Sequence, residues 1–202
     1  MSDNIVLASN NTGKLKEFTA LFAAHNIIIL PQSQFNVPEC PEPHCTFVEN
    51  ALAKARHASR YSGLPALADD SGICVNALAG APGVLSARFA GEPKSDFANN
   101  AKITELLQKQ VDKSCYYVCV LVFVRHPDDP QPIIAEGIWH GEWVNQAAGE
   151  GGFGYDPHFY LSEYAQTAAQ ILPEHKNLIS HRAKAMHELL TKFQAASLFQ
   201  AA

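Results

Sequence analysis

The chain has 202 residues, of which 47% are hydrophobic and 17% are charged, and its formal net charge is −5. This composition is ordinary for a globular protein with a sizeable core, and it excludes a disordered chain. The negative charge argues against a general surface for nucleic acid polymers. No apolar run reaches the roughly 18 to 20 residues that span a bilayer. We therefore expect one elaborated domain over residues 1–202, without membrane contact and cytoplasmic.

The number and spacing of the cysteines also fit a cytoplasmic protein. The five cysteines form an odd set without a paired Cys-x-x-Cys motif, which indicates reduced thiols rather than a disulfide framework. Cys40 and Cys45 flank His44, so a zinc site is the alternative interpretation there.

The first elements expected are a buried strand over Ile5–Ala8, a polar loop, and a helix with Leu15, Phe18 and Phe22 on one side. Thr12 is the expected N-cap, and the helix start would present backbone N–H groups to an anion. A Walker motif is excluded because its first glycine is missing. The alternative is a capped helix with a solvent-facing lysine. The candidate anion-binding residues are Ser9, Asn10, Asn11, Thr12, Gly13 and Lys14.

A second strand is expected over Ile27–Leu30, followed by a proline-rich loop that carries Glu39 and Glu42. Thr46 and Glu49 then fit a capping box at the start of a helix. That box gives Glu49 a structural role. Glu39, Glu42 and Glu49 all remain candidates for a second metal ligand.

The central stretch is an apolar run that ends in Asp69 and Asp70, followed by Ser71 and Gly72, where we expect a sharp turn. Side chains alternate along a strand, so the two carboxylates should point in opposite directions. We assign Asp70 to a magnesium site, because Mg²⁺ takes oxygen ligands and meets phosphates through one or two carboxylates. The alternative is a surface turn.

Further along, Ser95 or Asp96 can cap a helix that reaches about Gln110. The longest apolar run, residues 115–125, predicts a central strand, and residues 133–143 predict its hairpin partner with bulges near two glycines.

The glycine-rich stretch 149–157 lets the backbone approach a ligand, and it contains two aromatic residues and one acid. An aromatic ring can stack on a base and an aspartate can accept from ring N–H groups, which favours a nucleobase site. The alternative is a hairpin loop whose Phe153 covers the core. The candidates are Phe153, Gly154, Tyr155 and Asp156.

Lys176, His181 and Arg182 lie before or at the start of the last helix, with Ser180 as its expected cap. These donors can meet an anion or a carbonyl oxygen. The alternative is a basic first turn, which is unfavourable at the positive end of a helix.

Taken together, these motifs resemble the Ham1/RdgB family of inosine/xanthosine triphosphate pyrophosphatases from Ile5 to about Phe193. The resemblance rests on Ser9-x-Asn11-x-x-Lys14, Phe47-x-Glu49-Asn50-Ala51, Asp69-Asp70-Ser71-Gly72, Pro82-Gly83-x-x-Ser86-Ala87-Arg88, Gly152 to Pro157 and Ser180-His181-Arg182.

The resemblance implies an elongated, two-lobed α/β fold with a mixed, curved central sheet flanked by helices, a homodimer and a magnesium cofactor. It implies that Ser9 through Lys14 hold the triphosphate, that Asp70 is the catalytic base and metal carboxylate, and that Ser71 contacts substrate. It places Phe153 through Asp156, Lys176, His181 and Arg182 at the base. Spacing to Thr46 favours Glu42 as second metal ligand, with Glu39 and Glu49 as alternatives.

The implied activity is hydrolysis of ITP, dITP and XTP to monophosphate and pyrophosphate, which removes them from the nucleotide pool before they enter DNA or RNA. A carboxylate beside the metal can orient and deprotonate the attacking water. The alternatives are a pyrophosphatase for other modified nucleotides and a catalytically silent nucleotide-binding protein.

Overall fold

The structure, a computed structural model, describes residues 4–23, 25 and 27–198. Twelve helices and strands follow one another along these residues. In chain order they are β1 (Asn4–Leu7), α1 (Thr12–Ala23), β2 (Ile28–Pro31), α2 (Phe47–Ser62), β3 (Ala66–Val75), α3 (Asp96–Leu107), β4 (Ser114–Val124), β5 (Ile133–Trp143), β6 (Phe159–Leu161), β7 (Gln166–Thr167), α4 (Pro173–Ile179) and α5 (His181–Ala195). Short 3₁₀ turns lie between them, among them η3 (Gly83–Arg88) and η4 (Asp156–His158).

The strands form one seven-stranded sheet in the order β2-β1-β3-β4-β5-β6-β7. β1 runs parallel to both β2 and β3, whereas β6 runs antiparallel to β5 and β7. The sheet is therefore mixed, and the α/β class predicted from the sequence is confirmed.

The contacts divide the chain into two compact units. Unit 1 comprises Met1–Asp70, Cys119–Gly137 and Arg182–Ala202, and unit 2 comprises Ser71–Val118 and Ile138–His181. The single domain expected over residues 1–202 stays a prediction.

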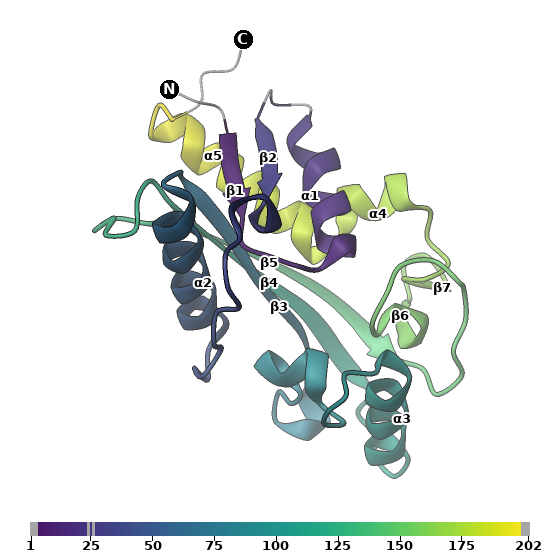
Figure 1. Ribbon diagram of the computed structural model, residues 1–202. Helices are drawn as coiled ribbons and strands as arrows, with labels where there is room; N and C mark the ends of the chain where they lie inside the picture. Colours follow the sequence, from purple (N-terminus) through teal and green to yellow (C-terminus); the bar gives the residue numbers. More distant parts are fainter. Residues whose placement is uncertain (1–3, 24, 26, 199–202) are drawn as a thin grey trace. The chain divides into compact units, whose positions relative to one another are not determined.

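The core of unit 1 joins helices from opposite ends of the chain. Phe18 and Phe22 of α1 are fully buried together with Leu189 of α5, and Phe193 of α5 packs edge-on against Phe123 of β4 at 4.8 Å between ring centroids. In Figure 1, the yellow α5 accordingly runs beside the purple β1 and β2. The i, i+4 spacing of the two α1 phenylalanines, read from the sequence, places them on this buried face.

The core of unit 2 is more aromatic. Ile103 and Leu107 of α3 pack in one cluster with Trp139 and Phe159. β5 runs through Gly141, where a Cβ would lie 2.7 Å from the Phe159 ring. The close approach of the Phe159 ring thus explains why position 141 is a glycine.

Two local predictions were wrong. The backbone does not turn at Ser71 and Gly72, because β3 continues to Val75 with every residue except Ser71 buried. Thr12 is not the cap of α1; the helix begins there, and the Asn11 side chain accepts from Lys14 N at 3.0 Å. Lys176 lies before the last helix, as predicted, but within a short helix of its own, α4, that was not predicted from the sequence.

Two predicted helix caps are confirmed. Thr46 and Ser95 cap α2 and α3 through their side chains. All five cysteines, each among the described residues, are free of disulfides. Within the part of the chain that the structure describes, no helix has both the length and the apolar character to cross a membrane.

Candidate functional site

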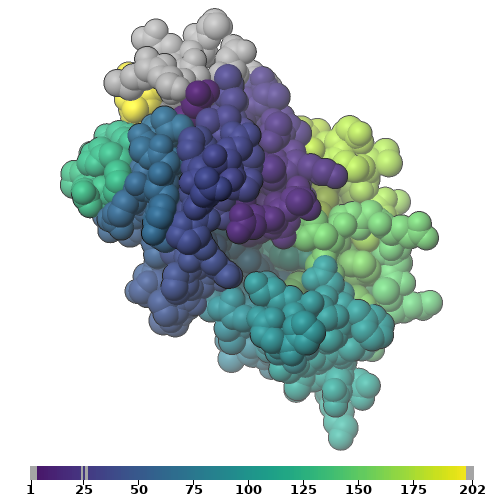
Figure 2. Space-filling model, viewed as in Figure 1, coloured from purple at the N-terminus to yellow at the C-terminus, as the bar shows by residue number. Residues whose placement is uncertain are grey.

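The polar loop of unit 1 is pre-shaped by its own side chains. Ser9 Oγ accepts from Asn11 N at 3.2 Å, and Asn10 Oδ1 accepts from Gln32 Nε2 at 2.8 Å. In Figure 2, the purple N-terminal segment and the blue segment that follows it adjoin on one face. Thr12 and Gly13 form the first turn of α1, where backbone N–H groups favour an anion.

Behind this loop, two cations share one fully buried carboxylate. Lys14 Nζ lies 3.3 Å from Asp69 Oδ1, and Arg182 Nε lies 3.0 Å from Asp69 Oδ2. The guanidinium also binds Glu17 at 2.9 Å. Burial opposes the charge of Arg182, but Asp69 and Glu17 still raise its pKa. The structure thus places Arg182 in unit 1 with Lys14, and its assignment to the base stays a prediction.

The neighbouring carboxylate, Asp70, belongs to a second cluster of unit 1. Lys54 of α2 donates to Asp70 Oδ1 at 2.7 Å, to Glu42 Oε1 at 3.0 Å and to the Asp69 carbonyl at 3.0 Å. Asp69 and Asp70 therefore meet different cations, as side-chain alternation along β3 predicts.

Burial and neighbouring charges act together on the pKa values in these clusters. Burial raises the pKa of Asp70, and Lys54 opposes that rise. Burial also works against the charge of Lys54, but Asp70 and Glu42 outweigh it and raise the pKa of this lysine. For Lys14, burial prevails over Asp69 and lowers the pKa.

Among the described residues, one carboxylate oxygen of this cluster is unpaired. Asp70 Oδ2 is buried, and within the described residues it has no hydrogen-bond partner. The same residues contain no group of three or more His, Cys, Asp or Glu side chains arranged to hold a metal. Magnesium commonly uses only one or two protein carboxylates together with substrate phosphates, so Asp70 and the neighbouring Glu42 fit such an ion.

The alternative metal ligands are less well placed. Glu39 is exposed, and the exposed Glu49 carboxylate accepts from the Thr46 hydroxyl at 2.5 Å, in keeping with its capping role. Glu42 is the one of the three that shares a lysine with Asp70.

In unit 2, the glycine-rich loop closes on Asp156. Its Oδ2 accepts from Phe153 N at 2.9 Å and from Lys176 Nζ at 2.7 Å, and its Oδ1 accepts from the Tyr117 hydroxyl at 3.2 Å. Lys176 also lies 5.4 Å from the centroid of the Phe153 ring. The structure thus brings together three residues predicted to contact the base: Phe153, Asp156 and Lys176.

Gly152 makes this closure possible. Its φ is +71°, and a Cβ there would lie 2.0 Å from Asp156 Oδ2. A side chain would therefore occupy the position of the carboxylate oxygen, and its backbone conformation would be strained.

Helix α3 and turn η3 hold the rest of the loop. Asp96 accepts from Gly154 N and Asn100 donates to the Gly154 carbonyl, both at 2.9 Å. The Tyr155 hydroxyl donates to the Ser86 carbonyl at 2.6 Å, and burial raises the pKa of this tyrosine. Tyr155 is thus anchored through its hydroxyl, which makes it a support of the loop.

The remaining two candidates also lie in unit 2. The buried His181 ring stacks on Tyr117 with centroids 4.6 Å apart and an 8° angle between the planes. Ser71 is partly exposed at the middle of β3.

Two residues of these clusters, Lys54 and Tyr117, were not predicted from the sequence. Lys54 stands one helical turn after the buried Asn50, and this spacing marks the inward face of α2. Tyr117 offered no such signal, because it lies in an apolar run that predicts a core strand.

Comparisons with known proteins agree over nearly the whole chain. Residues 5–192 match the Ham1 family. The chain is 65% identical to the dITP/XTP pyrophosphatase of Neisseria meningitidis serogroup B over 94% of this chain and 96% of that one. It is 63% identical to the dITP/XTP pyrophosphatase of Chromobacterium violaceum, over 96% and 99%. Among solved structures, a HAM1 protein from Coxiella burnetii superposes with a TM-score of 0.89 at 44% identity, covering 95% of this chain and 98% of the other.

Proposed function

The chain belongs to the Ham1 family, and from this premise we propose that it hydrolyses noncanonical purine nucleoside triphosphates, ITP, dITP and XTP, to the monophosphate and pyrophosphate. Removal of these compounds keeps them out of DNA and RNA. The observation that carries the proposal is the buried Oδ2 of Asp70, which has no hydrogen-bond partner among the described residues, while Lys54 holds the Oδ1 of the same carboxylate. This carboxylate lies in the same unit as the anion-binding loop.

In this reaction Asp70 is the general base. The oxygen of a water molecule forms a bond to the α-phosphorus, the bond from that phosphorus to the bridging oxygen breaks, and the water proton passes to the carboxylate. Burial raises the pKa of Asp70, which makes it a better proton acceptor than an exposed aspartate.

The N-terminal loop receives the charge of the phosphates. Ser9 through Gly13 offer hydroxyl, amide and backbone donors, and Lys14 adds a positive charge at the first turn of α1. Ser71 supplies a further hydroxyl to the substrate. These fixed donors stabilise the pyrophosphate as it leaves.

Magnesium is the proposed cofactor, held by Asp70 and Glu42. When bound, the ion supplies positive charge to the phosphates and lowers the pKa of water.

We assign the base to the candidate residues of unit 2, and the proposal that Arg182 is a further donor to the base rests on the family resemblance alone. Lys176 can donate to the 6-oxo group of hypoxanthine or xanthine, where adenine presents an amino donor. Phe153 offers a ring for stacking, Gly154 and Tyr155 shape the loop, and His181 adds a second polar ring. An adenine base would meet opposed donors, so the site discriminates against it.

We also propose that the protein works as a cytoplasmic homodimer and that residues 1–202 act as one Ham1/ITPase-like domain. Free cysteines suit a reducing compartment, which supports the location. Light scattering after gel filtration tests the dimer.

The test of the activity is pyrophosphate release from ITP, dITP, XTP, ATP, GTP and a pyrimidine triphosphate, each with magnesium and with EDTA. Magnesium-dependent release from the noncanonical purines alone is the expected result. Release chiefly from pyrimidines would favour a pyrophosphatase for other modified nucleotides, and binding without release would favour the silent nucleotide-binding protein.

A further inference from the structure

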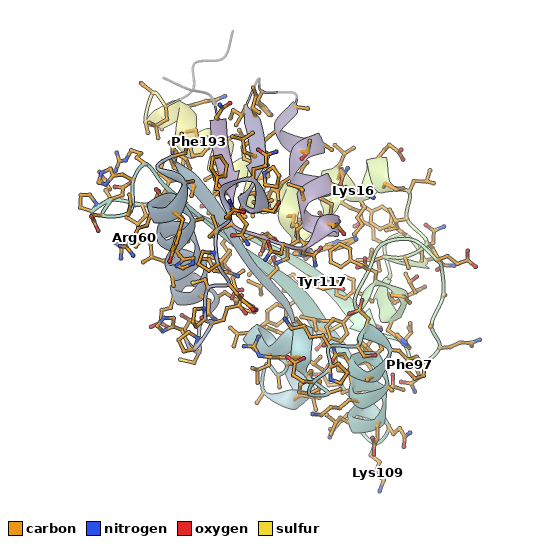
Figure 3. The ribbon with its side chains drawn as sticks, viewed as in Figure 1. Lys16, Arg60, Phe97, Lys109, Tyr117 and Phe193 are labelled. Atoms are coloured by element: carbon orange, nitrogen blue, oxygen red, sulfur yellow. The ribbon has the colours of Figure 1, made fainter. Side chains whose placement is uncertain are left out.

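Tyr117 stands at the centre of the aromatic cluster of unit 2. It extends from β4, is 8% exposed, and contacts Phe159 at 4.6 Å and Trp139 at 6.4 Å between ring centroids. Figure 3 labels it among the side chains that rise from the sheet. Strand residues packed on two sides hold their rotamers well, so its hydroxyl is a fixed point.

The hydroxyl of this tyrosine reaches the acid of the glycine-rich loop. Tyr117 donates to Asp156 Oδ1 at 3.2 Å, whereas Lys176 and Phe153 N donate to Oδ2. The carboxylate is thus held at both oxygens from different elements. Such a carboxylate cannot rotate about its Cβ–Cγ bond without losing a charge-assisted hydrogen bond.

The ring of Tyr117 has a second partner in the same group of candidates. His181 stacks on its face, nearly parallel, at 4.6 Å. One side chain thus orients Asp156 through its hydroxyl and His181 through its ring face, two residues assigned to the base by the proposed function.

We propose that Tyr117 is a positioning and specificity residue of the base site, and this inference rests on the proposed function. A carboxylate oxygen has two lone pairs, and the Tyr117 hydroxyl engages one of those on Oδ1. The other lone pair then has a set direction, suited to accept the ring N–H of a 6-oxopurine. Adenine has an acceptor nitrogen at that ring position, so the held oxygen repels it.

Tyr117→Phe tests this idea because it removes the hydroxyl and keeps the ring. We expect kcat/KM for ITP to fall about tenfold, mainly through KM, and the ITP-to-ATP ratio of kcat/KM to fall by a similar factor. Tyr116→Phe is the matched control: it makes the same change at the next position of β4, on the opposite face, where the ring lies beside His140. Its kinetics should equal those of the wild type.

A double-mutant cycle separates positioning from simple packing. If Tyr117 acts through Asp156, Tyr117→Phe should cause no further loss of selectivity in an Asp156→Asn background. If Tyr117→Phe lowers selectivity by the same factor in the wild-type and the Asp156→Asn background, the inference is overturned. Unchanged KM and selectivity in Tyr117→Phe would also overturn it, while activity of the wild type on ITP would leave the proposed function standing.

A wild-type measurement covers the case in which the variant does not fold. In protein labelled with 3-fluorotyrosine, addition of IMP should shift the fluorine resonance of Tyr117 and leave that of Tyr116 in place. No shift at saturating IMP would contradict the inference. A wild-type protein that hydrolyses none of the triphosphates would instead defeat the proposed function.

Discussion

The two units hold their polar groups in different ways. In unit 1, the carboxylates of Asp69 and Asp70 are buried on one strand and are balanced by Lys14, Lys54 and Arg182. In unit 2, a buried ion pair, Lys176 with Asp156, is set among aromatic rings and a backbone loop.

The two arrangements suit different parts of a nucleotide. Clustered charges, together with a carboxylate oxygen that has no hydrogen-bond partner among the described residues, suit phosphates and a hard cation. Rings with a few directed donors and acceptors suit a flat base, whose identity lies in its hydrogen-bonding edge. Removal of the Asp70 carboxylate in unit 1 should therefore change turnover, and removal of the Lys176 ammonium in unit 2 should change the choice of base.

The largest expected effect is that of Asp70→Asn. We expect kcat for ITP to fall about a thousandfold, because the general base is lost. Folding should persist, because a raised pKa means that the ionised form of this buried carboxylate opposes folding at neutral pH. Pyrophosphate release and thermal unfolding measure the two effects, and turnover within tenfold of the wild type would remove the role of Asp70.

Next comes Lys176→Ala, which should lower the ITP-to-ATP ratio of kcat/KM by about 10- to 100-fold, through loss of a charged donor. Lys102→Ala is the control in the same unit, since its ammonium donates to the Phe89 carbonyl at the surface. Lys176→Gln, which keeps a donor, should recover part of the ratio. A constant ratio in Lys176→Ala would show that base choice lies elsewhere.

A smaller effect is expected for Lys54→Met. The ammonium of Lys54 bonds Asp70 and Glu42, the carboxylates assigned to magnesium, so its removal should raise the magnesium affinity of the nucleotide-free protein several-fold. Calorimetric titration with magnesium chloride measures this, with Lys192→Met of α5 as control. Weaker binding in Lys54→Met would mean that the lysine supports the ion instead of competing with it.

The smallest effect on function is expected for Asp129→Asn, also in unit 1. Arg125 binds this buried carboxylate at 2.6 and 2.8 Å and lowers its pKa. A lowered pKa stabilises the fold above the ordinary value near 3.8, and this contribution is lost as the pH falls. The variant should lose about 1–3 kcal/mol of unfolding free energy at pH 7.

Denaturant titrations at neutral and acidic pH check that prediction. The difference in unfolding free energy between the variant and the wild type should disappear at acidic pH. Turnover and base choice at pH 7 should stay unchanged. A difference that persists in acid would mean that the charge of Asp129 is not its cause.

Local signals predicted much of the fold. The spacing of Phe18 and Phe22 predicted the buried face of α1, and the Thr46 box predicted the start of α2. They failed at Ser71 and Gly72, where turn-forming residues lie inside a long strand. Pairing within the sheet overrides the turn preference of two residues.

The same limit applies to the candidate site. Asp70 and the loop before Lys14 were proposed as site residues from the sequence, because carboxylates at the end of an apolar run and polar residues before a helix are uncommon. Lys54 and Tyr117 were not, since a lysine in a helix and a tyrosine in a strand are ordinary.

Sequence patterns were enough to predict the α/β class, the order of most elements and the residue types that can bind a nucleotide, because periodicity and capping act over a few neighbouring positions. The pairing of charged side chains, in contrast, depends on how distant segments pack together. Arg182 meets Asp69 from 113 positions away, and Lys176 meets Asp156 from 20. Such pairs form when separate elements pack together, and the cost of burying each charge selects the partner that balances it.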